Sequence, residues 1–136
     1  MTERLLLWGV VVHLVADWLL QNHWMATYKT SLKHPAAWVH SAIHFAGALL
    51  VFHPLAALFI FVTHILIDTR IPLRWWRGFY QQTGGEVTRT SDDGSRWVEV
   101  VGGVENRAGL HVAMWGDQVA HIAVIAIAAL AQSYLL

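Results

Sequence analysis

Four pairs of histidine and aspartate residues lie four positions apart within segments that are otherwise apolar. At 3.6 residues per turn, this spacing places two side chains on one face of a helix, one turn apart. Imidazole nitrogens and carboxylate oxygens are ligands that zinc, iron and manganese accept. The sequence therefore predicts a metal-binding face in each segment. The eight residues are His13 and Asp17, His40 and His44, His64 and Asp68, and Asp117 and His121.

This number of donors indicates more than one metal ion. Five imidazoles and three carboxylates exceed what one four-coordinate zinc ion binds, so we expect two divalent ions, or three with a bridging carboxylate. Zinc is the expected metal, and manganese and iron are alternatives. The carboxylates of Asp17, Asp68 and Asp117 are the candidate catalytic groups, because they would help to activate a metal-bound water.

Hydrogen bonding between helices is the simpler explanation for any one of these pairs. A central aspartate in a membrane helix costs about 2.5–3.5 kcal/mol, however, and chance rarely supplies one pair in each of four segments. The repetition therefore favours a shared metal centre over four separate hydrogen bonds.

The composition places these pairs in a membrane protein. Of the 136 residues, 56% are hydrophobic and 13% are charged, which is too apolar for an ordinary soluble domain. Four apolar segments approach the roughly 20 residues that a helix needs to cross a bilayer. We therefore predict an all-α fold, a four-helix transmembrane bundle in one domain over residues 1–136. Its helices are expected over residues 5–21, 35–52, 54–69 and 110–135.

Loop charges predict the orientation of this bundle in a bacterial inner membrane. Lys29 and Lys33 follow the first segment and three arginines follow the third, whereas the other face offers only Arg4 and the terminal amine. The positive-inside rule then places both termini outside and these loops in the cytoplasm. Each pair lies late in an inward-running segment or early in an outward-running one. All eight side chains are therefore expected at one level, in the inner half of the bundle.

A polar insert over about residues 78–109 separates the third and fourth segments. Its sequence GGEVTRTSDDGSRWVEVVGG has strand-forming residues on either side of a DG turn, which predicts a small cytoplasmic β-hairpin. The hairpin is either a solvated connector or a cap over the metal centre. Just before it, RIPLRWWRGFYQQ mixes arginine with aromatic residues, as segments at a membrane interface do.

Five further polar residues are candidates for orienting a metal ligand or contacting a substrate. Gln21 and Gln118 lie next to the pairs and suit hydrogen bonds to metal ligands. Arg70, Arg74 and Arg77 come directly after the third segment, where they are placed to bind a phosphate headgroup.

Charge and cysteine content exclude other kinds of protein. Nine lysine and arginine residues balance nine aspartate and glutamate residues, so no nucleic-acid partner is expected. The chain has no cysteine, which excludes disulfides and thiolate metal ligands. Small residues in AIAALA, near the C-terminus, permit close packing of a second copy, so a homodimer is an alternative to a monomer.

Four motifs resemble a bacterial family of small integral membrane proteins of unknown function, DUF3307. They are HLVADWLLQ, HSAIH, HILIDTRIP and DQVAH, and the resemblance covers nearly the whole chain without implying an activity. A looser resemblance is to the membrane-bound metal-dependent hydrolases. The His-x-x-x-Asp pairs are also similar to those of the zinc-dependent phospholipase C and single-strand nuclease group, which implies a helical three-zinc site. That group uses its N-terminal amine as a ligand, whereas Met1 is expected at the far face here.

Three classes of function fit these residues. The first is a metal-dependent hydrolase that acts on a phosphoester of a membrane lipid or another lipid-linked phosphate. The second is a metal-ion or proton transporter, because intramembrane histidine and aspartate residues also form ion pathways. The third, a diiron oxidase, is disfavoured because the Glu-x-x-His motif is absent. A transporter would need polar residues that continue to the outer side of the membrane, but the outer halves of the segments are almost wholly apolar. The site is therefore expected to open to the inner side only, which favours the hydrolase.

Overall fold

The computed structural model describes residues 1–79, 86–100 and 107–135, and it is mostly helical. Helices cover all four segments that the sequence predicts, and two shorter helices, α2 and α5, join them. The elements in chain order are α1 (Thr2–Val15), the π-helical turn η1 (Ala16–Leu20), α2 (His23–Tyr28), α3 (Pro35–Leu49), α4 (Pro54–Asp68), α5 (Ile71–Phe79), β1 (Glu86–Thr90), β2 (Arg96–Val100) and α6 (Arg107–Leu135).

The two central helices begin with the same local structure. Pro35 and Pro54 occupy the first positions of α3 and α4, where a missing N–H costs nothing. The histidine before each proline caps the helix, because its imidazole accepts a hydrogen bond from a backbone N–H of the first turn. These bonds join Ala36 N to His34 Nδ1 at 3.2 Å and Leu55 N to His53 Nδ1 at 3.4 Å. His34 and His53 are therefore explained as caps.

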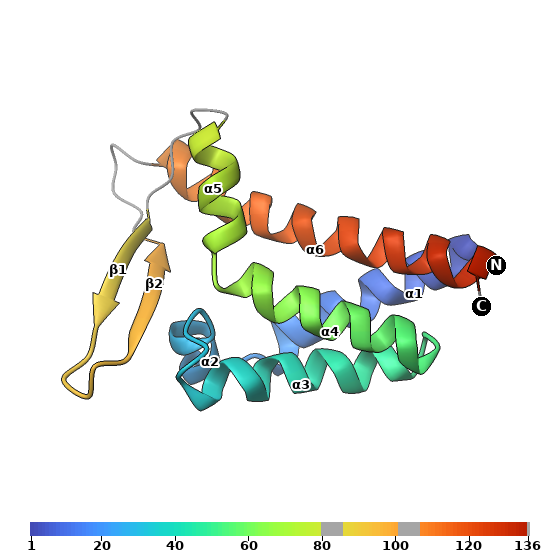
Figure 1. Cartoon of the computed structure of the whole chain (residues 1–136), viewed down its shortest axis with the longest axis horizontal. Helices are drawn as coiled ribbons and strands as arrows, with labels where there is room; N and C mark the ends of the chain where they lie inside the picture. Colours follow the sequence, from blue (N-terminus) through green and yellow to red (C-terminus); the bar gives the residue numbers. More distant parts are fainter. Residues whose placement is uncertain (80–85, 101–106, 136) are drawn as a thin grey trace.

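Four helices pack around one another in a ring. Helix α1 contacts α3 and α6, and α4 contacts the same two helices. Both chain termini lie at one end of the ring, and α2, α5 and the strands lie at the other (Figure 1). At the terminal end the Thr2 hydroxyl donates a hydrogen bond to Ser133 Oγ at 2.8 Å. The start of α1 is thus held beside the end of α6.

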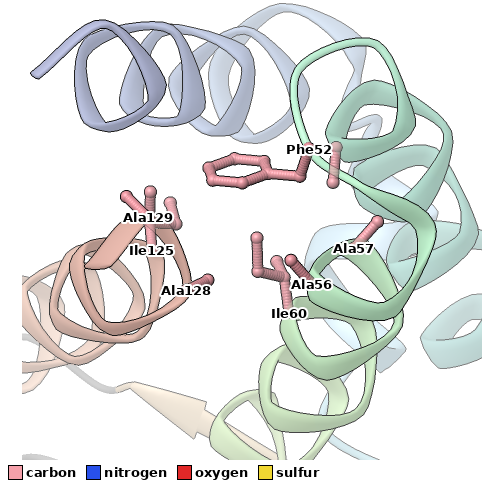
Figure 2. Close-up of a cluster of buried hydrophobic side chains, with 8 residues drawn as sticks. Phe52, Ala56, Ala57, Ile60, Ile125, Ala128 and Ala129 are labelled. Carbon is pink, nitrogen blue, oxygen red and sulfur yellow. The ribbon is translucent and has the colours of Figure 1, made fainter. Parts of the chain in front are cut away.

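The terminal half of the ring is filled by small apolar side chains around one phenylalanine (Figure 2). Phe52 points between α1, α4 and α6, and the alanines beside it let the helix backbones approach closely. The buried cluster consists of Ala48, Phe52, Ala56, Ala57, Ile60, Ile125, Ala128 and Ala129. We call it the apolar cluster.

The prediction of four membrane-spanning helices is not supported. Among the described residues, one helix is long and apolar enough to cross a membrane, α6 over Met114–Leu135. Helices α3 and α4 have 15 residues each, which at 1.5 Å per residue reach about 22 Å against a hydrocarbon core of about 30 Å. The second expected segment was too long because residues 50–52, counted within it, belong to the turn that leads into α4.

Two antiparallel strands occupy part of the polar insert. Strand β1 pairs with β2 in a register that places Glu86 opposite Val100 and Thr90 opposite Arg96. Gly94 takes a positive φ of 81° in the connecting turn, a conformation that glycine adopts without a steric penalty. The rest of the insert, residues 80–85 and 101–106, lies outside the described residues.

Candidate metal centre

The end of the first helix has a wider turn than an α-helix, and this turn carries Asp17. Helix α1 continues directly into the π-helical turn η1, after which Gln21 is extended with a ψ of 120°. Such π-helical turns occur frequently at functional sites because they redirect individual side chains. Here His13 Nε2 lies 3.4 Å from Asp17 Oδ2, so the pair faces the helix bundle together.

The structure brings all eight predicted ligands together in the half of the ring away from the termini. Each is buried, and none is more than 8% exposed. Helix α1 with η1, helix α3, helix α4 and helix α6 each contribute one pair, as the four-residue spacing requires. We call these residues the His/Asp cluster: His13, Asp17, His40, His44, His64, Asp68, Asp117 and His121.

The five imidazole rings touch one another at the centre of this cluster. The rings of His44 and His64 stack with centroids 3.8 Å apart, and His64 lies 4.3 Å from His121. The His13 ring is 4.9 Å from both His44 and His121. Rings this close would repel one another strongly if they were all protonated, and the neutral imidazole is the form that binds a metal.

One close pair of ligand atoms in the cluster is not hydrogen-bonded, whereas another pair, His44 Nε2 and Asp17 Oδ1, is hydrogen-bonded at 3.2 Å. His64 Nε2 lies 3.2 Å from Asp68 Oδ2, yet neither of these atoms has a hydrogen-bond partner among the described residues. Two ligands of a tetrahedral zinc ion are separated by roughly 3.3 Å when their bonds to it are about 2.0–2.1 Å. The separation therefore matches the distance expected between two ligands of one zinc ion.

The side chains form four overlapping groups of three potential metal ligands. Within each group, the ligand atoms lie within 4.8 Å of one another, and every residue is buried. The groups are His13 with His44 and His64, Asp17 with His40 and His44, His40 with His64 and Asp68, and Asp68 with Asp117 and His121.

Lys29 also belongs to this region, which the sequence analysis did not anticipate. Its side chain is 8% exposed, and its Nζ lies 3.6 Å from Asp17 Oδ1 and 3.5 Å from Asp68 Oδ1. Burial lowers the pKa of the ammonium, but the carboxylates of Asp68, Asp17 and Asp117 outweigh burial and raise the pKa above its ordinary value. The lysine therefore stays charged. Nothing in its sequence context, YKTSLKHP, distinguishes it from a loop lysine.

Arg70 reaches the cluster from the junction between α4 and α5. Its guanidinium Nη2 lies 3.3 Å from Asp117 Oδ2. Its φ is 63°, a left-handed conformation that costs a residue with a Cβ about 1–2 kcal/mol. The backbone therefore turns sharply directly after Asp68 and Thr69, and the turn lets the arginine point back to α6.

A pocket of about 440 Å³ opens onto one side of the cluster. Gln118 donates a hydrogen bond from Nε2 to Asp17 Oδ2 at 2.9 Å, and its Oε1 lies 3.3 Å from His13 Nε2. The buried Oε1 of Gln21 has no hydrogen-bond partner within the described part of the chain. The lining residues are Asp17, Trp18, Gln21, Ala26, Lys29, Arg70, Met114, Asp117 and Gln118.

Arg74, the second predicted arginine, is not among the residues that line this pocket. Arg74 is exposed on α5, and the side chain of Arg77 lies outside the described residues. Of the three arginines that the sequence analysis proposed for phosphate binding, Arg70 alone lines the pocket in the part of the chain that is described.

The comparison with known families matches a model described as a protein of unknown function, DUF3307, over residues 5–135. The chain belongs to the DUF3307 family. No curated protein and no solved structure matches it. The likenesses to the two hydrolase groups therefore remain likenesses of motif. The N-terminus lies at the end of the bundle opposite α2 and α5 (Figure 1).

Proposed function

We propose that this DUF3307 protein is a metal-dependent hydrolase of a phosphoester. One observation carries the proposal: eight buried donors meet beside a pocket that Lys29 and Arg70 also line. Metal ligands alone would suit storage or transport. Ligands next to a lysine and an arginine in an open pocket suit an anionic substrate that contacts metal and protein together.

The arrangement of the ligands supports two divalent ions, and zinc best fits the nitrogen and oxygen donors. An imidazole nitrogen coordinates a single metal ion. Two ligand groups that share a histidine therefore cannot both bind an ion at the same time. Two pairs of groups share no residue, and both pairs include Asp68 with Asp117 and His121. That group would form one site, and the second site would be either His13 with His44 and His64 or Asp17 with His40 and His44. No three of the four groups can be filled together.

Bound ions of this kind lower the pKa of a coordinated water and neutralise charge that develops on a phosphate. Side chains of the protein would bind the substrate and orient the metal ligands. Arg70, held by Asp117, presents its guanidinium to a phosphate oxygen, and the free Oε1 of Gln21 accepts a hydrogen bond from the substrate or from water. Gln118 keeps Asp17 and His13 in their orientations.

The apolar cluster favours hydrolysis over transport. An ion pathway through the ring would have to continue from the His/Asp cluster toward the termini. That direction is filled by Phe52, Ile60, Ile125 and alanines (Figure 2). The pocket that opens onto the centre lies instead on the side of Lys29 and Arg70.

A lipid-linked substrate in a bacterial inner membrane is the class that the surface supports. Trp18 lines the pocket and is 67% exposed, and Met114, across the pocket on α6, is 43% exposed. A phosphate in the pocket would therefore have apolar side chains at its exit, where an acyl or prenyl chain can lie. Exposed leucine, valine and tryptophan side chains on α1, α3, α4 and α6 also support a multi-pass bundle.

The orientation of that bundle, with both termini outside, is tested by reporter fusions after Leu136. We expect a reporter that is active outside the cytoplasm to work and a cytoplasmic reporter to fail. The opposite pattern would place the pocket on the outer side and contradict a substrate in the inner leaflet.

The activity is tested with purified, zinc-loaded protein in detergent. We expect release of phosphate or of an alcohol from a long-chain phosphatidate or an aryl phosphodiester, with loss of activity in a chelator. Asp117→Asn preserves the shape of the carboxylate but removes its charge, so activity is expected to fall by more than about 100-fold. Asp92→Asn, in the exposed turn between the strands, is the matched control and should leave activity unchanged.

Zinc or manganese flux across liposomes, together with no hydrolysis of either substrate, would establish the transporter instead. Retained activity in Asp117→Asn would contradict its place in the centre.

A further inference from the structure

The charged side chains beside the pocket nearly balance one another before any metal ion binds. Lys29 Nζ lies 3.6 Å from Asp17 Oδ1 and 3.5 Å from Asp68 Oδ1, and Arg70 Nη2 lies 3.3 Å from Asp117 Oδ2. Apart from the histidines, these five are the charged members of the pocket lining and of the His/Asp cluster among the described residues. Three carboxylates and two cations leave one net negative charge.

All five of these charged side chains are buried, so their total charge affects what the pocket can bind. None of the five residues is more than 8% exposed. Water and salt therefore screen them little, and a charge in such a place is costly unless an opposite charge neutralises it. A ligand in the pocket is thus selected by its charge as well as by its shape.

Two divalent ions change this balance to an excess of three positive charges. The ions bring four positive charges to side chains that supply one net negative charge, and the imidazoles bind metals in their neutral form. The count is the same for either choice of the second ligand group, because all three aspartates stay in the cluster in both cases. A protonated histidine would only increase the excess.

A phosphomonoester carries the charge that such a site requires. The attacking hydroxide contributes one negative charge, so two positive charges remain for the substrate to neutralise. A phosphate monoester carries close to two negative charges at pH 7, whereas a phosphodiester has one ionised oxygen and carries one. The monoester therefore neutralises the site, and the diester would leave a positive charge buried beside the ions.

We propose that the substrate is the phosphomonoester of a lipid alcohol and not a phosphodiester. The inference rests on the two-ion centre of the proposed function and names the substrate class of that site. One water hydrolyses this substrate to the lipid alcohol and inorganic phosphate. The water oxygen forms a bond to phosphorus, the ester P–O bond breaks, and the oxygen of the alcohol takes up a proton.

The first experiment compares two ligands that differ by one methyl group and one charge. Methylphosphonate and its monomethyl ester are titrated into zinc-loaded, full-length protein in detergent at alkaline pH, where methylphosphonate is a dianion. We expect the wild type to bind the dianion at least about tenfold more tightly. The matching lipids are phosphatidate and phosphatidylmethanol with identical acyl chains, and kcat/KM should be higher for phosphatidate.

Arg70 provides the variants that separate charge from shape. Arg70→Gln lowers the positive excess by one charge, so the ratio of the two affinities should fall by about tenfold. Arg70→Lys keeps the charge and should keep the ratio, although both affinities weaken. Lys33→Gln is the matched control, because Lys33 is exposed and outside the pocket lining, and both affinities should stay unchanged. Zinc content is measured for every variant.

The outcomes separate this inference from the proposed function. Equal affinities in the zinc-loaded wild type, tighter binding of the ester or binding of neither ligand overturns the inference, and hydrolysis of the aryl phosphodiester would then leave the proposed function standing. An unchanged ratio in Arg70→Gln with two zinc ions bound also overturns it. No zinc in the wild type overturns both. If Arg70→Gln does not fold or loses zinc, the wild-type comparison of the two ligands and the two lipids decides.

Discussion

The same four helices are packed with opposite chemistry in the two halves of their length. Toward the termini, alanines and Phe52 exclude water and bring the backbones close together. Toward α2 and α5, buried imidazoles and carboxylates leave polar atoms such as His40 Nδ1 without hydrogen-bond partners in the described structure. A polar atom in that condition normally costs about 1–3 kcal/mol. The apolar half therefore stabilises a polar half whose unpartnered atoms are candidates for binding ions.

The strongest test of this comparison uses two residues one turn apart on α4. We expect His64→Ala to lose at least one zinc ion per chain and to reduce activity by more than about 100-fold, because its imidazole belongs to two ligand groups. Ile60→Ala, in the apolar cluster, should lower the free energy of unfolding by about 2–5 kcal/mol and keep its zinc. Elemental analysis and thermal unfolding give both values.

Equal zinc content in His64→Ala and in the wild type would contradict the division between the halves. So would a loss of zinc in Ile60→Ala under conditions where that variant is still folded.

A pair of glycines tests how tightly the apolar half is packed. A Cβ at Gly9 would lie 2.7 Å from Ile125 Cγ2 and 2.8 Å from Phe52 Cε2, so Gly9→Ala is expected to destabilise the fold by about 1–3 kcal/mol. A Cβ at Gly116 meets nothing within 4 Å, and Gly116→Ala should stabilise α6 by about 0.5–1 kcal/mol. Both variants should retain their zinc. A neutral Gly9→Ala would show that the apolar half is looser than described.

Arg70 distinguishes substrate binding from ion binding within the polar half. Removing the guanidinium in Arg70→Gly or Arg70→Ala is expected to raise KM for a phosphoester about tenfold, corresponding to roughly 1.4 kcal/mol, with unchanged zinc content. Glycine adopts the φ of 63° without a penalty, so Arg70→Gly should be about 1 kcal/mol more stable than Arg70→Ala. A fall in zinc content in both variants would instead make Arg70 a support of the ligands.

Much of the polar half was predictable because helical periodicity is a local property. Pairs such as His64 and Asp68 had to share a helix face, and their place late or early in each segment indicated one level. The expected starts at residues 35 and 54 likewise match Pro35 and Pro54, the first residues of α3 and α4. The prediction of four membrane-spanning helices is not supported, because the number of apolar residues in a segment does not show where a turn ends the helix.

The sequence by itself determined which eight side chains were available as ligands and on which helix faces they lie, since spacing along a helix requires no knowledge of the neighbouring helices. Only the tertiary structure decided that Lys29 enters the His/Asp cluster and that Arg70 turns back to Asp117. It also decided that Arg74 does not line the pocket. The physical reason is that a charged loop residue has no periodic pattern. The position of Lys29 depends on the cap of α2 and on the π-helical turn before it, and the position of Arg70 depends on its own left-handed conformation. The directions of these features in space follow from helix packing.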